Sequence, residues 1–263
     1  MTAKDPTVAD ALAPLTALPG VAKAGDEARD ALGRVHRHRT NLRGWPDTAA
    51  EAALRAARAS SVLDGGPLKF SGAGPEAVGS GGADADPVLA GALRVAQALE
   101  GGEGALIKTW RRAPLQAIAR IHALAAADLS GGEPGRPRSA VDVGRRLELL
   151  ADVVAGASGV PATVLAAVVH GELLTLQPFG SADGVVARGV SRLVTIASGL
   201  DPHGLGVPEM HWMRRPAEYL AAARGFASGT PEGLTAWLVL SSEGLTAGAR
   251  EALSIAQSMS PAK

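Results

Sequence analysis

The stretch from Ala167 to Arg188, AVVHGELLTLQPFGSADGVVAR, decides the fold prediction for this chain. Its apolar first half predicts a helix that ends near Gln177, and a turn of small residues over 180–184 leads into a second apolar helix from Val185. A turn that enters a helix N-terminus leaves backbone N–H groups available to an anion. The pattern therefore indicates a candidate anion site, and an ordinary connecting loop is the alternative.

Length and charge set the limits for the rest of the chain. Its 263 residues are enough for one or two domains with a sizeable core. Lys and Arg total 26 and Asp and Glu total 26, so a formal net charge of zero gives no support to a nucleic-acid or membrane-surface partner. The absence of cysteine excludes a disulfide framework and a thiolate zinc site.

Composition predicts an all-α protein without a membrane span. Alanine is abundant, aromatic residues make up 3%, and β-branched clusters at period two are rare. The first residues lack the pattern of a signal peptide, and no apolar run approaches the roughly 18 residues that cross a bilayer. We expect a cytoplasmic protein.

Helical periodicity and Pro and Gly punctuation predict eight to ten helices. Residues 1–24 contain at most a short helix, and residues 65–86 read as a flexible Gly-rich linker. Asp47 or Thr48 is expected to cap the helix that runs from Ala49 to Leu63. The chain then divides into an N-terminal helical region, 1–85, and a main body, 86–263. The expected helices are 26–39, 49–63, 87–99, 105–128 with a break near Pro114, 141–155, 162–176, 185–198, 215–226 and 231–259.

The opening stretch resembles the Fic family signature, His-Pro-Phe-x-(Asp/Glu)-Gly-Asn-Gly-Arg-x-x-Arg. Four positions match in register, namely Pro178, Phe179, Gly184 and Arg188. Five depart from it: Gln177 replaces the histidine, Ser181 the acid, Ala182 a glycine, Asp183 the asparagine and Val185 the first arginine. The resemblance implies an adenylyltransferase-like fold with an altered active-site motif.

Further segments in the family's order extend the resemblance. Ser60-Ser61-Val62-Leu63-Asp64-Gly65 resembles the inhibitory motif Ser-x-x-x-Glu-Gly of regulated members, and Ile121-His122 with the loop 135–138 resembles a helix and loop before the core. The segment from Val207 to Tyr219, and then Trp237, resembles the region after it. A multi-helix Fic-like bundle with an N-terminal helical extension is implied. The β-hairpin flap that docks target chains is expected to be reduced or absent, because Ser139 leads almost directly into a helix.

The substitutions argue against AMPylation. In the family the motif histidine is the general base for a target hydroxyl, and Gln177 has no group that could accept that proton. The family acid holds Mg²⁺, for which the neutral Ser181 is a poor replacement, so we expect no metal ligand here. Val185 removes a phosphate-binding guanidinium. Ordinary AMP transfer is expected to be impaired.

The resemblance also implies which residues bind and regulate. A nucleotide or other phosphate-containing ligand, ATP included, would contact Gly180, Ala182, Asp183, Gly184 and Arg188. The regulatory residues would be Ser60, Asp64 and Gly65, with an ion pair between Asp64 and Arg188. The alternative is that Asp64 only precedes a helix stop and Arg188 is solvated.

The histidines are weaker candidates. His170 could serve as a displaced base, but we expect a core histidine bonded to backbone, and the same for His122. His36 and His38 fall in a charge run that is expected to be solvated, and no metal-ligand cluster surrounds His203 or His211.

Three functions remain open from the sequence. The leading one is a degenerate Fic-fold pseudoenzyme that regulates or binds a protein partner or a small phosphate-containing ligand. The second is an active transferase of another phosphate-containing group. The third is a purely structural helical module that forms a homodimer.

Overall fold

The computed structural model describes residues 8–66, 86–100, 104–130, 132–157 and 159–260. These residues form twelve α-helices and no strand, which confirms the all-α prediction and adds helices to the expected eight to ten. The N-terminal helices are α1 (Val8–Thr16), α2 (Val21–His36) and α3 (Asn41–Leu63). The rest are α4 (Pro87–Leu99), α5 (Ala105–Arg112), α6 (Pro114–Ala125), α7 (Val141–Gly156), α8 (Ala162–Leu176), α9 (Asp183–Ala197), α10 (Pro208–Arg214), α11 (Pro216–Ser228) and α12 (Pro231–Ser258).

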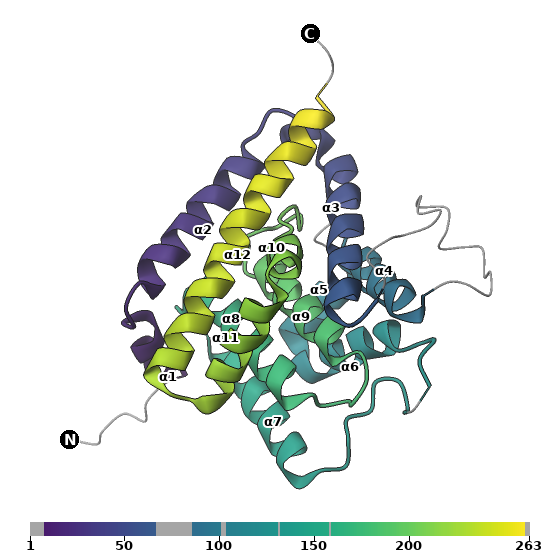
Figure 1. Cartoon of the computed structure of the whole chain (residues 1–263), viewed down its shortest axis with the longest axis vertical. Helices are drawn as coiled ribbons and strands as arrows, with labels where there is room; N and C mark the ends of the chain where they lie inside the picture. Colours follow the sequence, from purple (N-terminus) through teal and green to yellow (C-terminus); the bar gives the residue numbers. More distant parts are fainter. Residues whose placement is uncertain (1–7, 67–85, 101–103, 131, 158, 261–263) are drawn as a thin grey trace.

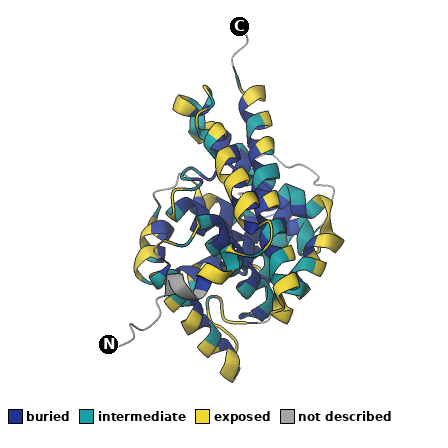
Figure 2. Ribbon diagram, turned by 90° about the vertical axis from the view of Figure 1, so that its left-hand side faces the viewer, coloured by how far each residue is buried: buried dark blue, intermediate teal, exposed yellow. Residues whose placement is uncertain are grey.

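Helix α9 is the centre of the bundle (Figure 1). It packs against α8, α6, α4, α5 and α3, and every residue from Val185 to Ile196 is buried. Figure 2 shows the same distribution, with buried segments inside and exposed residues on the outer faces. The helix is apolar over most of its surface because it is surrounded by other helices. The candidate motif therefore lies at the N-terminus of the most enclosed helix.

The N-terminal helices share their packing with the end of the chain. Helix α2 lies along α12, and α3 contacts α4, α10 and α12 (Figure 1). One apolar cluster joins Leu32 and Ala49 to Leu205 and Ala249. The division of the chain at 85/86 stays a prediction, and residues 67–85 of the expected linker lie outside the described residues.

Helix boundaries follow the proline signals closely. The break near Pro114 is confirmed by the separation of α5 from α6. Helix α3 begins earlier than expected, passing through a kink at Gly44 and enclosing Pro46. The expected cap is wrong, because the Thr48 hydroxyl donates to Asn41 Oδ1 and Trp45 O inside that helix. No described helix is long and apolar enough to cross a bilayer.

Candidate functional site

The motif turn joins α8 to α9 with a strained backbone. Gln177 ends α8 with a left-handed conformation (φ 48°, ψ 61°), and Ala182 adopts another (φ 50°, ψ 16°) just before α9. Among the described residues these are the only non-glycine positions with positive φ. Each costs roughly 1–2 kcal/mol, so other contacts must hold the turn. Helix α9 consequently begins at Asp183, two residues before the predicted start at Val185.

Asp183 closes the turn on itself. Its Oδ1 accepts the N–H of Phe179 at 2.9 Å, and its Oδ2 accepts the N–H of Gly180 at 2.7 Å. Burial raises the pKa of Asp183, and the two backbone hydrogen bonds act against that rise. The carboxylate thus takes two of the backbone donors that a bound anion would need.

Asp64 occupies the N-terminus of α9 from the end of α3. Its Oδ2 accepts the Val185 N–H at 2.9 Å, and its Oδ1 accepts from Arg188 Nη2 at 2.7 Å. The ion pair predicted between Asp64 and Arg188 is therefore confirmed. A Cβ on Gly184 would overlap Asp64 Oδ1, so the close approach depends on glycine. A carboxylate at a helix N-terminus is favoured by the helix dipole and satisfies an otherwise unpaired donor.

Arg188 is buried, with 2% of the whole residue exposed, and every nitrogen of its guanidinium has a hydrogen-bond partner. Its Nε donates to Ser60 Oγ at 2.8 Å, its Nη2 donates to Ser60 O at 2.9 Å, and its Nη1 lies 3.4 Å from Tyr219 Oη. Burial opposes the charge, but the Asp64 carboxylate outweighs that effect and raises the pKa of Arg188 above its ordinary value. Ser60 and Asp64, the predicted regulatory residues, both contact this guanidinium, whereas Gly65 follows α3 with φ 89°.

The polar chain continues from Arg188 through Tyr219 to His170. His170 Nε2 lies 2.8 Å from Tyr219 Oη, and its ring packs against Trp212 and Trp237. Burial, and then the charge of Arg188, lower the pKa of His170 well below its usual value. Burial raises the pKa of Tyr219 to about 12. His170 is thus a neutral core histidine, as expected. Its burial next to the charge of Arg188 argues against a role as general base in place of the missing motif histidine. Its hydrogen-bond partner is the Tyr219 hydroxyl and not the predicted backbone.

His122 supports the motif turn, a role that the sequence did not indicate. Its Nδ1 accepts the Gly135 N–H at 2.8 Å, so in the neutral ring Nε2 carries the proton and donates to Ser181 Oγ at 3.2 Å. Burial lowers the pKa of His122, which favours this neutral form. The ring also stacks on Phe179, with centroids 3.9 Å apart. In this tautomer His122 cannot take a proton from Ser181.

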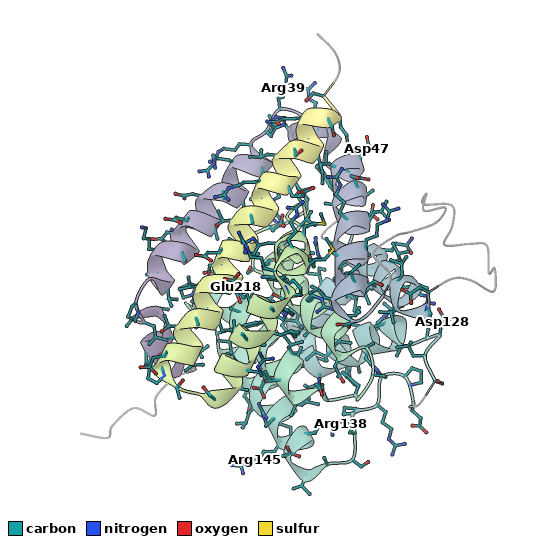
Figure 3. All side chains as sticks on the ribbon, viewed as in Figure 1. Arg39, Asp47, Asp128, Arg138, Arg145 and Glu218 are labelled. Atoms are coloured by element: carbon teal, nitrogen blue, oxygen red, sulfur yellow. The ribbon has the colours of Figure 1, made fainter. Side chains whose placement is uncertain are left out.

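Arg138 ties the connection between α6 and α7 to the end of α8. Its Nε donates to Gln177 O at 2.8 Å, its Nη2 donates to Leu176 O at 3.0 Å, and its backbone N–H donates to Pro178 O at 2.8 Å. Figure 3 labels Arg138 on this connection. The Gln177 side chain itself is exposed and makes no hydrogen bond within the described part of the chain.

The space around Arg188 is small. A cavity of about 20 Å³ adjoins Ser60, Val185 and Arg188, and another of about 10 Å³ is lined by Arg188 and Trp212. Volumes of roughly 10–15 Å³ are the least that hold one water. A nucleotide at the motif would therefore need Asp64 to move away from α9.

Within the described ranges no group of three or more His, Cys, Asp or Glu side chains is arranged to hold a metal ion. His36 is not part of a solvated charge run, because its Nε2 lies 2.8 Å from Asp201 Oδ1. His203 stacks on Trp45 with ring centroids 4.1 Å apart.

Comparison with known proteins gives no match to any protein-family model and none to the curated proteins. Solved structures do match. A Fic family protein from Desulfovibrio desulfuricans G20 has a TM-score of 0.68 at 19% identity, over 90% of this chain and 74% of that one. Fic-1 from C. elegans, residues 134–508, has a TM-score of 0.69 at 17% identity, over 94% of this chain and 76% of that one. A single-substitution variant of that fragment gives 0.70. The chain therefore has the fold of Fic family proteins.

Proposed function

We propose that this protein is a Fic-fold pseudoenzyme, impaired in AMP transfer, that regulates by binding a protein partner or a small ligand. One observation carries the proposal. The Asp64 and Asp183 carboxylates already accept the N–H groups of Phe179, Gly180 and Val185, which are backbone donors at the motif turn and the N-terminus of α9, where a phosphate would need such donors. A nucleotide phosphate would have to displace the Asp64 carboxylate and would then lie close to the Asp183 carboxylate.

The side chains around the turn support the same proposal. Gln177 has no titratable group, and general-base assistance is worth roughly 10²–10⁴-fold in rate. Ser181 accepts a hydrogen bond from His122, and its neutral oxygen is a weak ligand for Mg²⁺. Val185 is buried in the main apolar cluster and supplies no charge to a phosphate.

The alternative, transfer of another phosphate-containing group, is favoured by one feature. Arg188 keeps its guanidinium at the position where the family motif has its second arginine. If the Asp64 side chain moved away, the Arg188 Nη2 that now pairs with it could donate to a phosphate oxygen instead. A labelled donor distinguishes the two functions, because only the transferase passes label to protein.

Calorimetric titration with ATP, with and without Mg²⁺, tests the proposal. The wild type is expected to give no binding heat, and Asp64→Ala is expected to bind weakly at best because Asp183 remains. Asp47→Ala removes an exposed carboxylate elsewhere on α3 and is the matched control.

A parallel assay uses ATP labelled at the α- or γ-phosphate and follows label into protein. No incorporation is expected from the wild type. Incorporation that disappears in Arg188→Met would contradict the pseudoenzyme and establish the transferase.

A further inference from the structure

A cavity of about 360 Å³ lies between α10 and α12, apart from the motif turn. Its size falls within the range of small-molecule sites. Neither the turn residues nor their hydrogen-bond partners line it. Its lining is mostly charged and consists of His211, Arg214, Arg215, Ala247, Arg250 and Glu251.

Positive charge in this cavity exceeds the negative charge that could neutralise it. Glu251, its single lining carboxylate, is shared between Arg55 at 2.6 Å and Arg214 at 3.5 Å. Arg250 makes no ion pair or hydrogen bond with any described residue. The cavity therefore contains more guanidinium groups than its carboxylate can neutralise.

Arg215 is also incompletely paired. It lies 3.8 Å from Glu218, and both side chains are more than half exposed, so water screens the contact. Glu218 is labelled on α11 in Figure 3. Arg215 Nη1 approaches His211 as well, at 3.0–3.1 Å from the ring nitrogens.

His211 responds to the surplus charge. Burial, and then the charge of Arg215, lower the pKa of His211. Glu218 raises it, and the charges of Arg214 and Arg250 lower it by smaller amounts. The buried arginines elsewhere differ from these, since Arg188 faces Asp64 and Arg192 faces Glu209. Around this cavity, by contrast, Arg214 and Arg215 have only longer, exposed contacts with carboxylates, and Arg250 has none among the described residues.

We propose that this cavity binds a compact polyanion, a small molecule carrying a diphosphate or similar phosphate groups. Arginine forks bind phosphate oxygens through paired hydrogen bonds, and Arg214, Arg215 and Arg250 supply the forks. The neutral His211 can add one N–H donor. This site is independent of the proposed function of the motif turn.

Inorganic pyrophosphate is the probe, titrated calorimetrically into the full chain at low and at physiological ionic strength. We expect one molecule bound per chain. Arg250→Ala should weaken binding at least tenfold, and Arg250→Lys, which keeps the charge but loses the fork, should weaken it several-fold. Because Arg250 has no partner among the described residues, urea denaturation should show both variants as stable as the wild type.

Two controls decide where binding occurs. Arg145→Ala removes an exposed arginine of α7, far along the chain from this cavity, and should leave affinity within twofold. Asp64→Ala should also leave it within twofold. The proposal is overturned if the wild type does not bind, if Arg145→Ala weakens binding as much as Arg250→Ala, or if binding depends on Asp64 and not on Arg250.

Discussion

Replacing Asp64 with alanine should destabilise the protein more than its side-chain exposure of 20% suggests, because it leaves the Arg188 guanidinium charged at 1% exposure. Removing one partner of a buried ion pair costs roughly 3–5 kcal/mol. Losing the acceptor for the Val185 N–H adds about 1 kcal/mol, as for other helix caps. Water reaches part of Asp64 and lowers the first figure, so we expect a total of about 3 kcal/mol.

The pairwise part of this loss is measured with a double-mutant cycle. Arg188→Met alone should also destabilise, since Ser60 and Tyr219 lose their partner along with Asp64. Asp64→Ala and Arg188→Met together leave no unpaired charge. The double variant should therefore be more stable than the sum of the singles predicts, by about 2 kcal/mol.

Urea denaturation followed by circular dichroism gives the free energies of unfolding, provided that the m-value stays constant. Thermal scans should show Asp64→Ala melting lower by about 2–4 °C per kcal/mol for a domain of this size. Asp47→Ala combined with Arg188→Met is the control and should be additive. The reasoning fails if the coupling between Asp64 and Arg188 is below about 0.5 kcal/mol, the usual error of additivity.

Three further outcomes are expected. The pKa of His170 is lowered in the folded state, so at pH values below the unfolded pKa near 6.5 the unfolded chain binds one more proton than the folded chain. The free energy of unfolding should therefore decrease by about 1.4 kcal/mol for each unit by which the pH is lowered in that range. His170→Gln should remove this contribution of one proton in urea titrations from pH 7 to 5. Gly184→Ala places a Cβ 2.8 Å from Asp64 Cγ, so it should destabilise the wild type by about as much as the loss of a helix cap or more, yet change the Asp64→Ala protein by less than about 1 kcal/mol. Arg146→Ala breaks a 2.7 Å pair with Glu172 at 42% exposure of the arginine and should cost less than about 1 kcal/mol, and a larger loss would contradict our ranking of surface and buried pairs.

Much of the fold follows from local signals. Pro87, Pro114 and Pro231 each stand at the first position of a helix, where proline is tolerated, and the apolar periodicity between such signals gives the type of element. Helix α10 was not predicted because its seven residues are too few to show a period. Helix α2 starts earlier than predicted, at Val21, where Gly20 turns the chain with φ 80°.

A contact in the site could be predicted only where both of its residues lie in recognisable sequence motifs. The Asp64–Arg188 pair followed from two separate resemblances, since nothing local indicates a contact across 124 positions. The hydrogen bond between His36 and Asp201 was missed for the same reason, because these residues are 165 positions apart and no motif connects them. Asp183 was expected to face a ligand, but its two oxygens turn back to Phe179 and Gly180, which spacing alone does not determine.

The self-closed turn has a consequence for how this sequence could change over generations. Asp183→Asn would set an amide NH₂ against one of two backbone N–H groups, and Val185→Arg would bring a charge to a side chain only 3% exposed. Each of these two substitutions toward the Fic signature would thus lower stability before it could restore any chemistry. Selection acting one substitution at a time would therefore oppose both changes, and the hydrogen bonds of the closed turn favour keeping Asp183 and the apolar Val185.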